Sequence, residues 1–544
     1  MRESGILMHI SSLPGPYGIG TMGKNAYRYV DFLESAGQTY WQILPLTPTG
    51  YGDSPYQSCS TYAGNHYLID LDALVQDGLL TSEELSGICW GGNAEKVDFG
   101  LLYQHRLPVL RKAYSRFTDA EALEAFCREN GDWLPDFTLY MALKDEYQGL
   151  PWFSWPDQLK KRNPDALWQT RQNLRDSIRF YSFVQYLFFK QWNALRDYAH
   201  KKNVRIIGDV PIYVPMDSVD VWANPELFQL DGDLKPEAVA GVPPDGFTAD
   251  GQLWGNPLYR WEAHAADGYS WWIRRLKAAA RLYDVIRIDH FRGFEAYWSV
   301  PYGDKTAKNG VWVKGPGMDF LRAISKALPD VGMIAEDLGF LTQEVLDMRD
   351  ASGLPGMKVL GFAFDSREPS EYLPYTYPAN SVCYTGTHDN MTTRQWFDTA
   401  SADAVAYAKE YMTLSEEEGY TDILEKLRVL HGFPVEELEE TESTTEPSTE
   451  PVNSITQEPF VVYLTGSDTR SKKLNKSRSD VNILAIVNPK TKQVLLVNTP
   501  RDYYVPNPKG KGKLDKLTNC GLYGPENSMK TLSDLYDVPV DYYA

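Results

Sequence analysis

Short runs of apolar and β-branched residues, each closed by a Gly, Pro or Asp turn, recur through the first four hundred residues. Helical patterns separate them, at 26–36, 178–200 and 319–327. This alternation predicts β-α-β units built on a parallel sheet, an α/β fold of the (β/α)8 barrel type. The runs predict seven parallel strands, at 5–10, 39–46, 204–210, 285–288, 331–335, 359–364 and 381–385.

Two stretches depart from a simple barrel. Residues 50–200 are far too many for a normal βα connection, so we expect an inserted helical subdomain there, with helical patterns at 137–147 and 180–192. After the seventh strand, helices are predicted at 402–412 and 421–430, but no eighth strand follows. Residues 436–459 carry eight Glu, no Lys or Arg, and many Ser, Thr and Pro, which predicts a disordered linker.

The tail has a different character. Residues 461–544 hold 13 Lys/Arg against 8 Asp/Glu, whereas the whole chain has a net charge of −19. Two strands, 481–487 and 494–497, are predicted to pair through a turn at 488–492. We therefore expect three parts: a catalytic barrel over 1–420, a helix and acidic linker over 421–460, and a partial α/β domain over 461–544.

Bulk composition excludes several classes of function. The net charge of −19 argues against nucleic acid or an anionic membrane as the main partner. Five cysteines without CxxC spacing argue against a zinc site or a disulfide framework. The N-terminus lacks the apolar region of a signal peptide, and no run reaches the ~18 apolar residues of a membrane span. We expect a soluble cytoplasmic enzyme with no membrane segment.

Three carboxylates follow predicted strands. Asp289, Glu336 and Asp389 are spaced by 47 and 53 residues, which suits one or two strand-plus-helix units. Barrels of this type do their chemistry at the C-terminal ends of strands, and paired carboxylates break glycosidic bonds. Any one such acid alone is more often a helix N-cap or a solvated loop residue. Together they point to carbohydrate chemistry.

Neighbouring residues support this interpretation. Arg287 lies two residues before Asp289, so on a strand both side chains point the same way, and the cation favours the ionised carboxylate. His388 can hydrogen-bond a sugar hydroxyl, while Glu336 is the acid that must hold a proton near neutral pH. Aromatic residues, 13% of the chain, recur in loops such as 53–57 and 251–259, where they can stack on sugar rings.

Eight motifs in order give the first 420 residues a resemblance to 4-α-glucanotransferase, the amylomaltase family of the α-amylase clan. They are SSLPGPYGIG at 11–20, GDSPYQ at 52–57, GDVPIYV at 208–214, GVPPD at 241–245, GQLWGNP at 251–257, RIDHFRG at 287–293, AEDLG at 335–339 and GTHD at 386–389. The resemblance implies that Asp289 is the nucleophile, Glu336 the general acid/base and Asp389 the residue that stabilises the transition state. It implies substrate-binding roles for Arg287, His388, Tyr56, Ser54, Asp209, Trp254 and Asn256.

The implied reaction is a retaining double displacement on maltooligosaccharides and other α-1,4-glucans, with the two carboxyls about 5–5.5 Å apart. An acceptor sugar hydroxyl gives transfer and water gives hydrolysis; the resemblance favours transfer. No metal or cofactor is required. One departure stands out, because the family continues through an eighth strand that this sequence lacks. Its loss exposes two strand edges and is expected to cost several kcal/mol, against a net domain stability of about 5–15 kcal/mol.

Three motifs, GSDTR at 466–470, RSD at 478–480 and NTPRDY at 498–503, give the tail a resemblance to the LytR-CpsA-Psr family. That family transfers glycopolymers from polyprenyl-pyrophosphate carriers to the cell wall. The resemblance covers about 458–544 and implies a vestigial pyrophosphate site formed by Asp468, Arg470, Arg478, Asp480, Arg501 and Asp502. Arginines suit pyrophosphate and carboxylates suit a divalent cation. The fragment covers about half of such a domain and lacks its membrane anchor, so independent activity is not expected.

Three functions compete on this evidence. The first is a cytoplasmic 4-α-glucanotransferase, which the intact carboxylates favour. The second is a glucan-binding protein without turnover, in which the incomplete barrel fails to hold Asp289 and Glu336 in register. The third is a cell-wall glycopolymer transferase acting through the tail. The joining of two partial domains suggests a fused or misassembled reading frame in which a glucanotransferase gene lost its 3′ end.

Overall fold

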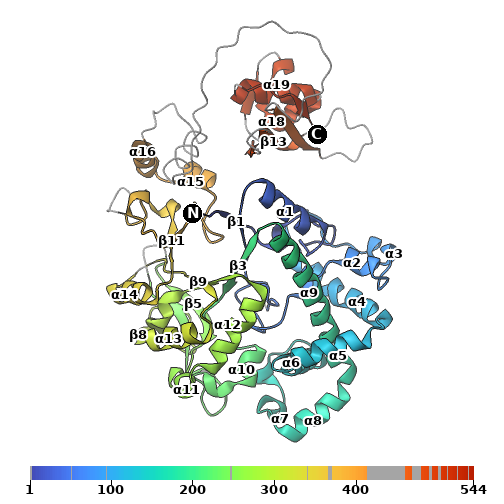
Figure 1. Cartoon of the computed structure of the whole chain (residues 1–544), viewed down its shortest axis with the longest axis vertical. Coiled ribbons are helices and arrows are strands. Elements are labelled where there is room, and N and C mark those ends of the chain that lie inside the picture. The colour runs from blue at the N-terminus through green and yellow to red at the C-terminus, as the bar shows by residue number, and fades with distance from the viewer. Residues whose placement is uncertain are drawn as a thin grey trace. The chain divides into compact units, whose positions relative to one another are not determined.

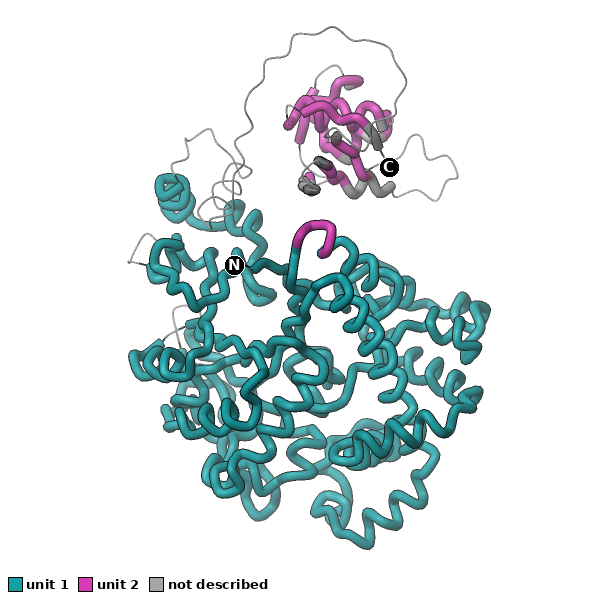
Figure 2. Tube along the Cα trace, viewed as in Figure 1, with its two compact units in different colours: residues 1–33, 38–436 teal, residues 34–37, 437–544 magenta. Residues whose placement is uncertain are grey.

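The chain divides into two compact units (Figure 2), residues 1–33 with 38–436 and residues 437–544 with 34–37. A computed structural model describes residues 3–50, 52–93, 95–244, 248–339, 341–364, 370–412, 460–467, 479–488, 493–499, 504–510, 513–523, 525–536 and 538–543. The predicted helix at 421–430 and the predicted linker at 436–459 lie outside these residues.

Seven parallel strands form the central sheet of the first unit, in the order in which they occur along the chain (Figure 1). They are β1 (Gly5–Leu7), β2 (Tyr40–Gln42), β3 (Arg205–Val210), β6 (Val285–Ile288), β9 (Gly332–Ala335), β10 (Gly356–Val359) and β11 (Ser381–Tyr384). Sequential parallel strands with helical connections are the pattern of a (β/α) barrel, so the predicted fold class is confirmed. Within the described residues, no eighth strand joins the outer edge of β1 or of β11.

One predicted strand was misplaced. The run at 359–364 was expected to be a strand, but β10 ends at Val359 and residues Leu360–Phe362 form a 3-10 helix, η6. Leu360 and Phe364 bury their side chains in a small cluster with Ala408 and Met412. A short, fully apolar run cannot be assigned to strand or helix by periodicity alone, which explains the error.

Helices fill the connections of this unit. They are α1 (Lys24–Ser35), α2 (Leu71–Gln76), α3 (Ser82–Ser86), α4 (Phe99–Arg116), α5 (Ala120–Glu129), α6 (Leu134–Glu146), α7 (Asp157–Lys160), α8 (Pro164–Asn173), α9 (Arg175–Lys201), α10 (Val219–Ala223), α11 (Trp261–Ala266), α12 (Ser270–Leu282), α13 (Gly317–Ala327), α14 (Gln343–Ser352), α15 (Thr393–Thr399) and α16 (Ala402–Tyr411). The segment between β2 and β3 is helical, as expected. Its long helix α9 packs against α4, α5 and α6, and also against α12 and β3 (Figure 1).

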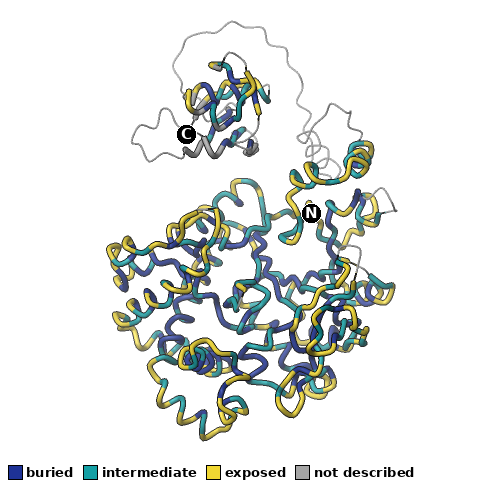
Figure 3. The backbone as a smooth tube through the Cα atoms, turned by 180° about the vertical axis from the view of Figure 1, so that it is seen from behind, coloured by how far each residue is buried: buried dark blue, intermediate teal, exposed yellow. Residues whose placement is uncertain are grey.

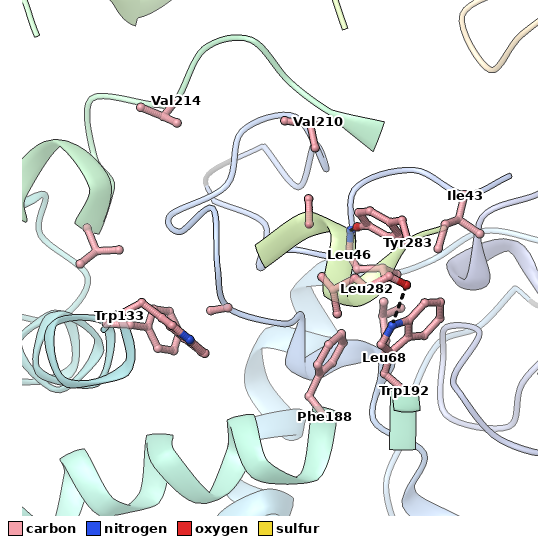
Figure 4. Close-up of a cluster of buried hydrophobic side chains, with 14 of the residues drawn as sticks. Ile43, Leu46, Leu68, Trp133, Phe188, Trp192, Val210, Val214, Leu282 and Tyr283 are labelled. Carbon is pink, nitrogen blue, oxygen red and sulfur yellow. Dashed lines mark hydrogen bonds between the residues drawn. The ribbon is translucent and has the colours of Figure 1, made fainter. Parts of the chain in front are cut away.

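The main core lies where α9 and α12 meet the sheet (Figure 4). Trp192 of α9 is fully buried and donates its indole N–H to the carbonyl of Leu282. The Tyr283 hydroxyl accepts the backbone N–H of Leu46 at 3.1 Å. The tyrosine ring rests on Gly208 of β3, where an added Cβ would lie 2.1 Å from it. Seen from behind, buried residues run through the interior while exposed ones face outward (Figure 3).

A second, antiparallel sheet was not predicted. Its order is β5 (Gln252–Pro257), β4 (Ala238–Val242), β7 (Ala296–Pro301) and β8 (Val311–Lys314). These strands mix Gly, Pro, Trp and polar residues and lack clear alternation, so their pairing emerges only from tertiary contacts. Its strand β5 carries two of the predicted substrate-binding residues, Trp254 and Asn256.

The second unit is a small α/β body. Its main sheet has the order β14 (Gln493–Asn498), β13 (Ser479–Asn488), β12 (Phe460–Ser467) and β17 (Tyr542–Tyr543). The strands expected at 481–487 and 494–497 lie in β13 and β14, which pair antiparallel. The other elements are β15 (Tyr504–Pro506), β16 (Leu514–Lys516), α18 (Leu517–Cys520) and α19 (Pro525–Tyr536). Among the described residues of the chain, no helix is long and apolar enough to cross a membrane.

Candidate active site

The strand register brings Asp289 and Glu336 to the same height on neighbouring strands. The last paired residues of β6 and β9 are Ile288 and Ala335, and each carboxylate is the next residue along its strand. The ladder continues past them, since the Glu336 amide donates to the Ile288 carbonyl at 3.0 Å. Neighbouring strands lie about 4.8 Å apart, so the two backbones start from that separation.

Backbone amides fix the Glu336 carboxylate. One oxygen accepts the N–H of His290 at 2.7 Å and the other accepts the N–H of Leu338 at 2.9 Å. His290 can donate in this way because it adopts a left-handed conformation with φ of 51° directly after Asp289. The turn that follows β6 therefore fixes the side chain of Glu336, which follows the neighbouring strand β9.

Arg287 links two carboxylates inside the sheet. Its guanidinium Nη1 lies 2.6 Å from Asp209 Oδ2 and 2.9 Å from Asp289 Oδ1. The side chains of Arg287 and Asp209 are 3% and 1% exposed, whereas that of Asp289 is 28% exposed. Arg287 and Asp209 sit opposite each other in the β3–β6 register. The Arg287–Asp209 pair is therefore enclosed within the sheet, whereas Asp289 is partly exposed at the C-terminal end of β6.

Tyr56 joins the far edge of the sheet to its centre. Its hydroxyl donates to Asp209 Oδ2 at 2.7 Å and lies 2.7 Å from His388 Nε2, while the two rings stack with a centroid separation of 5.5 Å. The Tyr56 hydroxyl has one hydrogen, which it donates in the hydrogen bond to Asp209. The Tyr56 oxygen must therefore accept from His388, which places the imidazole proton on Nε2.

Electrostatics set the two central carboxylates apart from ordinary surface acids. Burial raises the pKa of Asp289 to about 7; Arg287 lowers this pKa, and Asp209 and Glu336 raise it further. Burial also raises the pKa of Glu336, against the pull of Arg287 and the two amides. The cation acts on Asp289 in the expected direction, but burial outweighs it. The raised pKa of Glu336 has the sign that a general acid requires.

Asp389 is placed differently from the other two acids. It lies five residues beyond β11, the edge strand, and its side chain is 70% exposed. Its Oδ2 is 3.3 Å from His388 Nε2. Burial lowers the pKa of His388, although Asp389 and Asp209 oppose this, so the imidazole is neutral at pH 7. The histidine thus connects Asp389 to Tyr56.

The loop 52–57 and strand β5 supply the remaining predicted residues. The Ser54 hydroxyl accepts the amide of Tyr56 at 3.3 Å. Asn256 is buried and accepts from Gln57 Nε2 at 3.2 Å, which ties the loop to β5. Trp254 packs edge-on against His290, with ring centroids 4.8 Å apart. These two segments therefore lie beside the carboxylates, because Tyr56 bonds to Asp209 and Trp254 packs on His290. Ser54 and Asn256 hold the loop in place.

Sequence reasoning missed two residues of this site, His290 and Asp337. Each directly follows a predicted catalytic acid in the same motif, so adjacency was the available signal. His290 provides a backbone donor, and Asp337 is buried beside Glu336. Their roles depend on backbone geometry and burial, which residue type does not reveal.

Most residues of the pyrophosphate site predicted in the tail cannot be placed. Asp468, Arg470, Arg478, Arg501 and Asp502 lie outside the described residues, while Asp480 belongs to β13. That site therefore stays a prediction.

Comparisons with known proteins agree with the geometry of the first unit. The family model described as 4-alpha-glucanotransferase matches residues 8–439, and the LytR_cpsA_psr family model matches residues 434–544. The chain is 50% identical over 417 residues to the 4-alpha-glucanotransferase of Clostridium butyricum, covering 76% of this chain and 86% of that protein. It is 49% identical over 436 residues to the enzyme of Streptococcus pneumoniae serotype 4, covering 79% and 85%.

A solved structure extends the likeness. The amylomaltase from Streptococcus agalactiae in complex with acarbose superimposes with a TM-score of 0.76 at 43% identity, covering 78% of this chain and 88% of that chain. A family model that spans most of the chain and relatives near half identity leave one assignment: the chain belongs to the 4-alpha-glucanotransferase family.

Proposed function

We propose that the chain transfers α-1,4-glucan segments between maltodextrins, with Asp289 as nucleophile and Glu336 as general acid/base. The observation that carries the proposal is the register of β6 and β9, which sets both carboxylates one residue past the paired ends of adjacent strands. A strand spacing of about 4.8 Å is compatible with the separation of about 5–5.5 Å between the two carboxyl groups of retaining enzymes. Neutral maltooligosaccharides in the cytoplasm are the proposed substrates.

The first half-reaction breaks the donor's glycosidic bond. Arg287 holds Asp289 Oδ1, so Oδ2 attacks the anomeric carbon. Glu336, whose pKa burial raises, gives its proton to the leaving glycosidic oxygen. A covalent glucosyl-enzyme remains, and Glu336 is left as a carboxylate held by two amides.

The second half-reaction reverses these roles. Glu336 takes the proton of an acceptor hydroxyl, whose oxygen attacks the anomeric carbon and releases Asp289. A 4-hydroxyl of another glucan gives transfer, and water gives hydrolysis. Asp389 lies at the open edge, where an exposed anion can bind sugar hydroxyls and stabilise the positive charge of the transition state. His388, which lies 3.3 Å from Asp389, holds Tyr56 beside this edge.

The test is disproportionation of maltotriose by the purified full chain. We expect glucose and a ladder of longer maltooligosaccharides, resolved by chromatography, and their loss in Asp289→Asn and Glu336→Gln. A matched control, Asp319→Asn, neutralises a carboxylate that is 82% exposed on α13 and should leave the ladder unchanged. Glucose and maltose without longer products would mean hydrolysis. Maltotriose binding without turnover would refute the proposal in favour of a glucan-binding protein.

A further inference from the structure

Asp337 makes two short hydrogen bonds directly behind the catalytic acid. It follows Glu336 in the chain, and its side chain is 1% exposed. One oxygen lies 2.6 Å from Arg349 Nη1 of α14, and the other accepts the backbone N–H of Met357, in β10, at 2.6 Å. A carboxylate buried this deeply requires compensation, and these two donors provide it.

Asp337 bridges the two strands that share the shortest ladder in the central sheet. Strands β9 and β10 share a single register pair, Ala335 with Gly356, whereas β6 and β9 share four pairs. Asp337 supplies a side-chain acceptor where a longer ladder would supply a carbonyl. The fit is tight, because a Cβ at Gly356 would lie 2.5 Å from Asp337 Oδ2.

Met357 connects this bridge to the other half of the site. Its sulfur lies 3.4 Å from Arg287 Nε, on the guanidinium that holds Asp289. The backbone of Met357 is thus fixed by Asp337 while its side chain packs against Arg287. The buried carboxylate of Asp337 therefore helps to position both Glu336, its neighbour in the chain, and Arg287, through Met357.

We propose that Asp337 and Arg349 form a positioning pair, which pins β10 to β9 and sets the protonation of Glu336 without touching the substrate. This inference rests on the proposed role of Glu336.

Charge gives the pair a second effect. Among the described residues, the titratable groups around Glu336 are Arg287 of β6, Asp289 directly after that strand, Tyr372 and Asp337. Arg349 faces Asp337 from α14. Asp337 raises the pKa of Glu336, whereas Arg287 lowers it. Arg349 partly neutralises Asp337. Removing Asp337 should therefore lower the pKa of Glu336, and removing Arg349 should raise it.

Two single variants distinguish an electrostatic effect on Glu336 from a general loss of stability. Asp337→Asn keeps an oxygen for the Met357 amide but removes the anion, so the alkaline limb of the maltotriose profile should move to lower pH. Arg349→Met leaves the anion uncompensated, so the same limb should move to higher pH. We expect each displacement to be on the order of one pH unit. Asp350→Asn removes the exposed second partner of Arg349 and should leave the limb in place.

A second readout does not depend on activity. Asp337→Ala deletes the acceptor of the Met357 amide, so peptides covering 354–359 should exchange amide hydrogen faster than in wild type, while Asp337→Asn should retain protection. Equal losses of kcat in both single variants without opposite displacements would overturn the proposal, as would unchanged exchange in Asp337→Ala. Absence of turnover in the wild-type chain would instead refute the proposed function, and the exchange measurement would still decide whether Asp337 pins the strands.

Discussion

Arg287→Met is the sharpest perturbation of the site, because it removes the cation from between two carboxylates while retaining an unbranched side chain. At the 2.9 Å separation from Asp289 Oδ1, the Coulomb attraction is about 6 kcal/mol at an effective dielectric of 20 and about 1.4 kcal/mol in bulk water. Asp289 is 28% exposed, so water screens the pair. A value of about 2–3 kcal/mol corresponds to about two pKa units.

The consequence for activity follows from the sign of the shift. With its pKa at about 7, Asp289 is ionised in roughly half of the molecules at pH 7. In Arg287→Met this pKa should rise to roughly 9, which leaves about 1% ionised, a loss of about 50-fold in kcat/KM at pH 7. The pKa of Glu336 should also rise, since Arg287 lowers it. The whole bell-shaped profile should therefore move to higher pH, with partial recovery near pH 9.

The assay is the initial rate of maltotriose disproportionation from pH 5 to pH 10, combined with thermal unfolding. Truncating a buried ion pair should also cost about 3–5 kcal/mol of stability. Arg275→Met is the matched control, because Arg275 is 3% exposed and donates to the carbonyls of Ile212 and Pro211 and to the Tyr259 hydroxyl, which carry no charge. It should lose stability without moving the profile. Arg287→Lys should keep the profile in place at a lower rate. A loss for Arg287→Met that is equal at every pH would refute the electrostatic reasoning.

Three further outcomes test the site and the core. The wild-type kcat/KM should fall as pH drops below about 7, because Asp289 must be ionised, and fall again at high pH, because Glu336 must be protonated; a pH–rate profile with no acid limb would contradict this. Tyr56→Phe removes the hydroxyl that bridges an aspartate and a histidine, and should lower kcat/KM by about tenfold in maltotriose assays; a change below about twofold would count against the bridge. Gly208→Ala pushes a Cβ into the tyrosine ring above it and should cost about 1–3 kcal/mol by thermal unfolding, whereas Gly87→Ala, with open space around it, should not.

Much of the fold follows from local patterns. The strands at 204–210, 285–288 and 331–335 were predicted within one residue of β3, β6 and β9, because buried parallel strands need short apolar runs closed by turns. Helices α9 and α16 were predicted for the corresponding reason, a helical period over ten residues or more. Where the pattern was ambiguous, as at 359–364, or mixed, as in the antiparallel sheet, local reasoning failed.

The same distinction between local sequence pattern and tertiary packing applies to the candidate site. The sequence by itself determined that Asp289 and Glu336 directly follow strands and that Arg287 lies on the same side as Asp289, since a strand's period of two requires it. The tertiary structure alone decided that Asp209 and Arg287, 78 residues apart, share a bond, and that Tyr56 meets His388 across 332 residues. It also decided that burial outweighs Arg287 at Asp289 and that Asp389 stays exposed. Register and desolvation are properties of packed segments, and no local stretch of sequence contains them.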